Sequence, residues 1–565
     1  MHPLLCLAAV LGTAAPAGRE LAVDLWDWTP PCRDLAIFRR WVADLKSIGA
    51  TRVEISAPWR LLEPRPGEHD LTFIAERLAI VEEAWLGLRV RINSYYSGAT
   101  PDWLECDRWM DAQGKPAADI PSITDARFWE RYAPLCTAIA RRFRGRGVQY
   151  SPFIGVHAEL KWSDWWSYDR STLASWRTAI GARPRAAWLG RIVGGADLPE
   201  RPPVPGPTGG APDLDAANRA WIAFREECWR EAVRRFVAAI RAGDARAAVS
   251  VPLGESYRRE SAAMSNLDYR GLSRGAAHVR HSYDFFWHAG QDPWQAAASV
   301  AAFRGITRLP VSLEIDGPVL FQQFGYREED LLRIAGAALG AGAMLKVANF
   351  SYLERLPSSW PFMVELGRRA AAAAAPVDPP PAETVLLFVS KWANYLYREP
   401  TQWLHDAQFG AWRMLTTAGY PVRVVCEDNL AEGLGRYRGL YVAFSPPELM
   451  PEADRSALNR LARRLPSVTE LARAPLPGED PAAVGSCPAG AFAAWAPGLP
   501  AHVDGPAAPA VDGRRVALGY PLAYVWLQGT DRAAQDRVLG WACARSWGPP
   551  RRERASAPQV TRSRR

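Results

Sequence analysis

The sequence of 565 residues predicts an α/β protein in which a (β/α)8 TIM barrel precedes a smaller α/β domain of flavodoxin-like type. Between residues 19 and 375, short apolar runs alternate with amphipathic stretches, and eight of these runs are strand-like. Repeated βα units of this number are typical of a closed parallel barrel. A proline-rich break then precedes a second, shorter series of apolar runs, which predicts a layered α/β domain.

The barrel region, residues 19–375, is divided into elements by its apolar periodicity. We expect strands at residues 21–28, 52–57, 88–92, 150–156, 247–252, 279–285, 309–315 and 344–350. Amphipathic stretches between them predict helices at residues 37–48, 73–86, 128–143, 221–242, 293–303 and 331–339. The main insertion is expected between residues 161 and 218, where the run PPVPGPTGG is typical of a loop.

The second domain is expected to span residues 383–548, after a linker at residues 376–382 that follows an alanine run and contains PVDPPP. Its apolar runs predict strands at residues 384–389, 422–426, 440–444 and 516–520. Helices are predicted at residues 408–418, 451–461 and 531–544.

The two ends of the sequence are interpreted as lying outside these domains. Residues 1–18 form a short apolar stretch that ends in Ala15-Pro-Ala17, which indicates a cleaved signal peptide. We therefore expect a secreted or periplasmic protein, whereas a misassigned translation start would predict a cytoplasmic one. Residues 549–565 are Arg-rich and are expected to be disordered.

Charge and cysteine content exclude several classes of function. The formal net charge is +8, but the last 17 residues hold six Arg and one Glu, so most of the excess lies in that tail and nucleic acid is not an expected partner. The eight cysteines form no Cys-x-x-Cys pair or Cys/His cluster, and we expect neither a metal site nor a cofactor. After the N-terminus, no apolar run approaches the ~20 residues of a membrane span.

Two glutamates lie at predicted strand ends, where barrel enzymes carry their chemistry. Glu159 follows the fourth strand in GVHAE, and Glu314 lies in VSLEID at the seventh. Two carboxyl groups ~5–5.5 Å apart, one protonated and one ionised, suit retaining glycoside hydrolysis. We assign Glu159 as the acid/base and Glu314 as the nucleophile, acting on a glycoside or oligosaccharide. In the alternative interpretation, Glu159 is the salt-bridge partner of Lys161. Glu314 is then a structural residue, and its neighbour Asp316 carries the chemistry.

Other side chains near predicted strand ends are candidates for substrate binding: Trp59, Asn93, Tyr95, His157, Glu255, Tyr283, Asp284 and Asn349. A hydrogen bond from Tyr283 is expected to keep the nucleophile ionised. Core packing or loop bracing is the alternative for these residues. Three tryptophans follow Glu159 in KWSDWW, and we interpret Trp162, Trp165 and Trp166 as a stacking platform for sugar rings. Packing of the insertion against the barrel is the alternative.

Several segments, in order over residues 21–360, resemble the family 42 β-galactosidases and their clan A relatives. They are VEISAPWRLLEPRPGEHDLTF at residues 53–73, NSYYSGATPDWL at residues 93–104, MDAQG at residues 110–114, STLASWRTAI at residues 171–180 and IAGAALGAGA at residues 334–343. The resemblance implies a retaining mechanism, a galactoside-like substrate and a homotrimer. It also implies that the second domain corresponds to a trimerisation domain with an amidotransferase-like fold.

Two departures from the family pattern bear on activity. Ala158 stands where clan members carry an Asn before the acid/base, and Asn349 and Phe350 occupy the stretch where a Trp is common. A catalytically weak or inactive carbohydrate-binding relative is therefore the alternative function. LYVAFSP at residues 440–446 has no Cys where an amidotransferase would carry its nucleophile, which argues against that activity.

Overall fold

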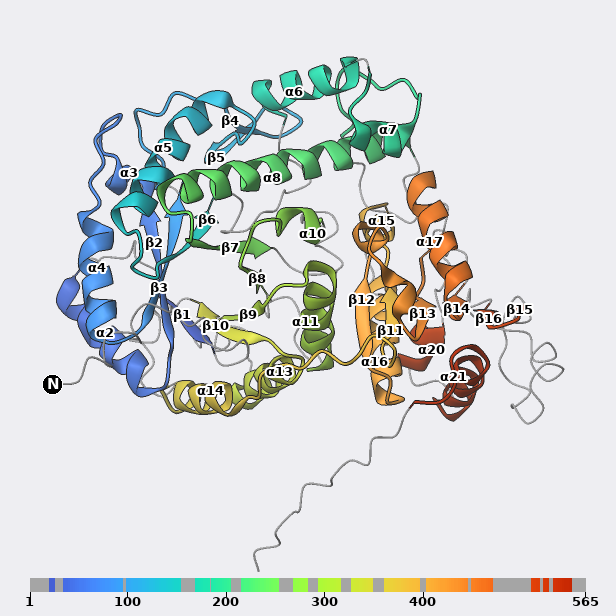
Figure 1. Cartoon of the computed structure of the whole chain (residues 1–565). Helices are drawn as coiled ribbons and strands as arrows, with labels where there is room; N and C mark the ends of the chain where they lie inside the picture. The colour runs from blue at the N-terminus through green and yellow to red at the C-terminus, as the bar shows by residue number, and fades with distance from the viewer. Residues whose placement is uncertain are drawn as a thin grey trace, which may run out of the picture.

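The computed structural model describes residues 20–25, 34–94, 98–153, 168–182, 184–204, 215–253, 268–282, 293–316, 327–348, 360–396, 403–445, 449–470, 510–518, 522–527 and 532–550. Figure 1 shows a ring of strands surrounded by helices, with a second sheet beside it. The predicted combination of a TIM barrel and a smaller α/β domain is confirmed.

Eight parallel strands close the barrel in the order β1-β10-β9-β8-β7-β6-β3-β2. They are β1 Leu21–Leu25, β2 Arg52–Pro58, β3 Gly87–Asn93, β6 Gln149–Phe153, β7 Ala248–Leu253, β8 His278–Ser282, β9 Val311–Asp316 and β10 Met344–Ala348. Each overlaps a predicted strand. The apolar runs were informative because residues that face the surrounding helices must be apolar in a barrel.

The outer layer consists of helices that follow the strands. They are α2 Leu35–Ser47, α3 Trp59–Leu62, α4 Thr72–Glu83, α5 Ala126–Arg142, α8 Ala216–Gly243, α10 Tyr269–Leu272, α11 Trp294–Thr307, α13 Glu328–Gly340 and α14 Trp360–Ala372. Four of the long helices begin after a capping aspartate whose carboxylate accepts backbone N–H groups of the first turn, namely Asp34, Asp125, Asp169 and Asp215.

Several elements of this layer were not predicted from the sequence. Helix α14 is one of them, and Ala370 and the next two residues complete it, since alanine favours a helix. The predicted insertion contains ordered elements, α6 Arg170–Gly181 and α7 Ala187–Val193, and α8 begins directly after Asp215. A short hairpin, β4 Arg108–Met110 with β5 Pro116–Pro121, was also not predicted.

The second sheet has the order β12-β11-β13-β14-β16-β15, with all pairs parallel except the last. Its elements are β11 Val385–Phe388, α15 Lys391–Leu396, α16 Trp403–Thr417, β12 Val422–Val425, η6 Glu427–Asn429, η7 Leu434–Arg436, β13 Gly439–Val442, α17 Glu452–Arg464, β14 Ser467–Glu470, β15 Ala510–Asp512, β16 Arg515–Leu518, α20 Leu522–Leu527 and α21 Arg532–Ser546. The five parallel strands follow the 2-1-3-4-5 order of flavodoxin-like domains.

The barrel and the second sheet meet where α11 packs against β12 (Figure 1). A Cβ atom placed on Gly305 of α11 would lie 2.3 Å from the backbone oxygen of Val424, so only glycine permits this approach. The guanidinium of Arg423 donates to the Gly305 carbonyl at 3.1 Å, and the Asn429 amide donates to the Ile306 carbonyl at 3.0 Å.

Among the described residues, no helix is both long and apolar enough to cross a membrane. The five cysteines in this part of the chain are free thiols, and no group of His, Cys, Asp and Glu among the described residues could hold a metal ion.

Candidate functional site

The interior of the barrel is lined by charged side chains instead of the branched aliphatic residues that usually fill a TIM barrel. Along β2, Val53, Ile55 and Ala57 belong to the hydrophobic core, while Glu54 between them forms ion pairs with residues of other strands. The same alternation recurs on β3, where Arg89 and Arg91 are buried among apolar neighbours in sequence. These two strands therefore present an apolar face to the helices and a charged face to the barrel interior.

Lys346 of β10 lies at the centre of this interior and is completely buried. Its Nζ lies 2.5 Å from Glu314 Oε2, 3.0 Å from Glu54 Oε1 and 3.4 Å from Asp24 Oδ2. One ammonium group thus bridges carboxylates from β1, β2 and β9. Arg91 adds a second cation, which reaches both oxygens of Asp24 at 2.6 Å.

Glu314 is the predicted nucleophile and lies in the C-terminal half of β9. Its backbone position aligns with Ser282, the last residue of β8, which places it near the end of the barrel where the loops after the strands begin. The same Oε2 atom that contacts Lys346 accepts a hydrogen bond from Arg280 Nη1 at 2.6 Å. Burial alone would raise the pKa of Glu314, but the charges of Arg280 and Lys346 outweigh it and lower the pKa to about 2. The carboxyl group is therefore ionised at any physiological pH.

Asn93, a predicted substrate-binding residue, is the last residue of β3 and is fully buried. Its amide donates to the Ser56 hydroxyl at 3.2 Å, which links the ends of β2 and β3.

Trp59 was predicted to bind substrate but is completely buried in the barrel wall. Its ring centroid lies 5.2 Å from that of Tyr132 and 5.9 Å from that of Trp103, and its indole N–H donates to Glu63 at 2.7 Å. Glu63 also accepts the backbone N–H of Gly67 at 2.7 Å and so closes the Glu-Pro-x-x-Gly turn. In this position the indole has no face open to a sugar ring.

The remaining predicted site residues lie outside the described residues, and their roles stay predictions. They are the acid/base Glu159 and the substrate-binding candidates Tyr95, His157, Trp162, Trp165, Trp166, Glu255, Tyr283, Asp284 and Asn349.

The sequence alone does not identify the cations around Glu314. Arg280 and Lys346 are distant from it in the sequence and become its neighbours only through the pairing of β8, β9 and β10. A signal was nevertheless present, because parallel strands buried on both faces usually read as continuous apolar runs. The alternation of charged and apolar residues in RVEIS, LRVRI and HVRHS departs from that pattern and indicates a polar interior.

Comparison with solved structures supports the fold prediction. A β-galactosidase from the psychrophilic Marinomonas ef1 superimposes with a TM-score of 0.60 and 13% identity, over 93% of this chain and 91% of that one. A β-galactosidase from the haloarchaeon Halorubrum lacusprofundi gives a TM-score of 0.58 and 15% identity, over 80% of this chain and 72% of that one. A β-galactosidase from Bacillus circulans sp. alkalophilus gives a TM-score of 0.57 and 11% identity, over 80% of this chain and 71% of that one. No family model matches the sequence, and no curated protein is similar to it. The chain therefore has the fold of these β-galactosidases.

Proposed function

We propose that the protein is a retaining glycoside hydrolase that cleaves β-glycosidic bonds, with a galactoside-like sugar as its substrate. The observation that carries this proposal is Glu314, an ionised carboxylate near the loop end of a barrel that has the fold of β-galactosidases. A nucleophile in double displacement must be ionised before the substrate arrives, and the cations around Glu314 meet that requirement.

In the proposed reaction, a Glu314 oxygen forms a bond to the anomeric carbon while the bond from that carbon to the glycosidic oxygen breaks. The departing oxygen takes the proton of the Glu159 carboxylic acid. Glu159, now ionised, removes a proton from water, which attacks the anomeric carbon and releases Glu314. Arg280 and Lys346 contact one oxygen of Glu314, so we assign the other oxygen, Oε1, to the attack.

A second candidate, a carbohydrate-binding protein with weak or no turnover, is favoured by the same contacts. Two cations within 2.6 Å of one carboxylate withdraw electron density from it and lower its nucleophilicity. In that case Glu314 acts as the counter-ion of Arg280 and Lys346 and takes no part in chemistry.

Hydrolysis of a panel of aryl β-glycosides and oligosaccharides, by the full chain and by Glu314→Ala, tests the first proposal. We expect turnover that is lost in Glu314→Ala and restored by azide, with an α-glycosyl azide as product, because azide replaces the missing carboxylate. Glu54→Gln is the matched control, since Glu54 is buried in the same ion-pair network and contacts the same lysine. Activity in Glu314→Ala without azide would contradict the assignment, and binding of a sugar without turnover by the full chain would favour the second candidate.

A further inference from the structure

A cavity of about 660 Å³ lies between the barrel and the second domain, and Glu314 does not line it. Its barrel side consists of residues of α7, of α8 and of the segment 268–274, which contains α10. Its other side consists of residues between 427 and 431, which include η6, and of residues of α17. A volume of this size accommodates a small organic molecule, and the proposed function assigns none to it.

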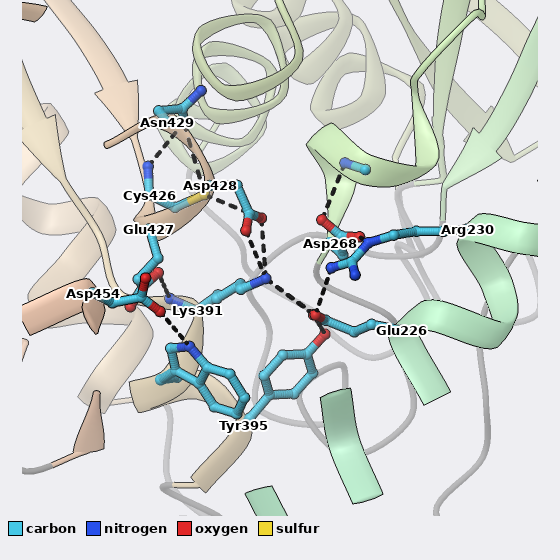
Figure 2. Close-up of polar contacts among 12 residues, drawn as sticks. Glu226, Arg230, Asp268, Lys391, Tyr395, Cys426, Glu427, Asp428, Asn429 and Asp454 are labelled. Carbon is cyan, nitrogen blue, oxygen red and sulfur yellow. Dashed lines mark hydrogen bonds and ion pairs between the residues drawn. The ribbon is translucent and has the colours of Figure 1, made fainter. Parts of the chain in front are cut away.

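The walls of this cavity are held together by a buried contact that crosses the interface. Lys391 of α15 places its Nζ 3.2 Å from both oxygens of Glu226 of α8, and the lysine side chain is 4% exposed. The Tyr395 hydroxyl donates to the same carboxylate at 2.7 Å (Figure 2). The two sides of the cavity are therefore fixed relative to each other before any ligand arrives.

Two acidic side chains, Asp268 from the barrel side and Asp428 from η6, lie in the inner part of the cavity (Figure 2). Asp268 is 1% exposed, and the side chain of Asp428 is 15% exposed. Arg230 pairs with Asp268, and Lys391 Nζ lies 2.9 Å from Asp428 Oδ1, so each carboxylate already has a cation. A carboxylate has about four lone-pair sites, and both groups can therefore also accept hydrogen bonds from neutral donors such as hydroxyl groups.

The other carboxylates that line the cavity in the described part of the chain are also held by partners. Glu227 pairs with Arg230 at 2.9 Å, and Glu231 pairs with Arg234 at 2.6 Å. Asp454 pairs with Arg191, and Glu427 accepts the Ser390 hydroxyl and the backbone N–H of Lys391. Of the six arginines among the described lining residues, these pairs engage three, and Arg270 is engaged by Glu432 at 2.8 Å.

Arg274 and Arg460 are the remaining two, and neither guanidinium has an ion-pair or hydrogen-bond partner among the described residues. Arg274 follows α10 on the barrel side, whereas Arg460 lies on α17, on the same helical face as Ala453 and Ala457 of the lining. Both arginines are exposed, which places them at the mouth of the cavity. Two groups of the same charge on the two walls of one cavity repel each other, and an anion between them removes that repulsion.

The chemistry of the lining selects the class of ligand. Guanidinium groups suit phosphate, whose three free oxygens can accept hydrogen bonds from both walls at once. The carboxylates deeper in the cavity suit hydroxyl groups. No aromatic side chain is among the described lining residues, so none of them can stack on a planar ring. These features favour a ligand with a phosphate at one end and hydroxyl groups at the other.

We propose that this cavity binds a phosphorylated sugar, with the phosphate held by Arg274 and Arg460 and the sugar hydroxyl groups donating to Asp268 and Asp428. Because the ligand contacts both walls, its binding stabilises the association of the barrel with the second domain. This inference goes beyond the proposed function and does not depend on it, since Glu314 is not part of the site.

Isothermal titration calorimetry of the full chain at pH 7 and low ionic strength tests the site. The probes are glucose 6-phosphate, galactose 6-phosphate and mannose 6-phosphate, compared with the free hexoses, inorganic phosphate and glucuronate. We expect at least one hexose phosphate to bind, and to bind more tightly than its free hexose or inorganic phosphate, because only the phosphorylated sugar uses both ends of the cavity. Added salt should weaken this binding, since it screens the two exposed arginines.

Arg274→Gln and Arg460→Gln should each lower the affinity for that hexose phosphate by about tenfold, as expected for the loss of one charge-assisted hydrogen bond. Both residues are exposed, so the variants are expected to fold. Arg246→Gln in the barrel and Arg436→Gln in η7 are the matched controls. These arginines are also exposed but do not line the cavity, and their replacement should leave the affinity unchanged.

Several results would overturn the proposal. They are the absence of binding for all three hexose phosphates, an affinity that is unchanged in Arg274→Gln and Arg460→Gln, and an equal loss in the two control variants. Tighter binding of glucuronate than of the hexose phosphates would overturn the assignment of the anion as phosphate. Glu314→Ala should retain the full affinity, and a loss there would place the ligand inside the barrel instead. The result is therefore distinguishable from the outcome of the hydrolysis experiment.

Discussion

Replacement of Lys346 by methionine tests whether the cations inside the barrel are needed to hold its carboxylates together. The substitution preserves the approximate length of the side chain and removes its charge. It leaves Asp24, Glu54 and Glu314, each within 3.4 Å of the lysine Nζ, without their common counter-ion. No solvent reaches Lys346, so water cannot compensate for the loss.

The size of the effect follows from the remaining contacts. Breaking a buried ion pair by removing one partner costs about 3–5 kcal/mol in the free energy of unfolding. Arg91 still contacts Asp24 and Arg280 still contacts Glu314, so we expect the lower end of this range, about 3 kcal/mol at pH 7.

The loss should depend on pH in a defined direction. In the unmodified chain, burial raises the pKa of Glu54 and of Glu314, but Lys346 and the neighbouring arginines together outweigh burial and hold both pKa values below the usual value. The stability that this provides is present above the pKa of the unfolded chain, ~4.3, and disappears as the pH falls through the lower folded value. In Lys346→Met the pKa values of these carboxyl groups are higher, so protonation relieves the unpaired charge at a higher pH than in the unmodified chain. The variant should therefore be closer to the unmodified chain at pH 5 than at pH 7.

Urea unfolding followed by tryptophan fluorescence at pH 5 and pH 7 measures both effects. Lys46→Met is the matched control, because Lys46 is exposed at the end of α2 and its replacement should change the free energy of unfolding by no more than ~0.5 kcal/mol. A loss at pH 7 no larger than that of Lys46→Met would refute the reasoning, and so would an equal loss at both pH values.

Three further predictions concern other parts of the molecule. Gly305→Ala should lower the melting temperature, since its Cβ would meet the Val424 backbone, and overpacking of this kind costs about 1–3 kcal/mol; an unchanged melting temperature would show that α11 and β12 can separate. Glu63→Ala should destabilise the barrel by about 1–3 kcal/mol, measured by urea unfolding, because the buried indole N–H of Trp59 loses its acceptor. Burial raises the pKa of Glu470 to about 7, so stability should fall as the pH rises from 5 to 7; Glu470→Gln should remove this part of the fall in a pH series of melting temperatures.

The fold could be predicted from the sequence because its signals are local. An apolar run with a helical stretch on either side identifies a strand wherever it occurs. The eight strands can therefore be located without knowing which of them pair. Elements whose signals are weak or shared with other structures were missed. Helix α14 ends in an alanine run, which low-complexity sequence also contains, and the β4–β5 hairpin is short and contains prolines.

The candidate site could be predicted only in part, because its chemistry depends on pairing between strands. Position at a strand end was enough to select Glu314. Its ionisation, however, depends on Arg280 and Lys346, which reach it only when β8, β9 and β10 are aligned in register. The contact between Glu226 of α8 and Lys391 of α15 could not be predicted from the sequence either, since the two residues are separated by 165 residues.

The charged barrel interior bears on the choice between the two candidate functions. Buried ion pairs are weak evidence for stability, because well-packed apolar residues of similar volume often replace them without loss. A barrel needs only volume in its interior, and branched aliphatic side chains provide it at lower desolvation cost. The charges of Arg280 and Lys346 both converge on one oxygen of Glu314 and keep it ionised while burial opposes this. An ionised carboxylate is required for double displacement, and the two cations meet that requirement. The same two contacts also lower the nucleophilicity of Glu314, as a counter-ion role would, so the azide experiment on Glu314→Ala decides between the hydrolase and the binding protein.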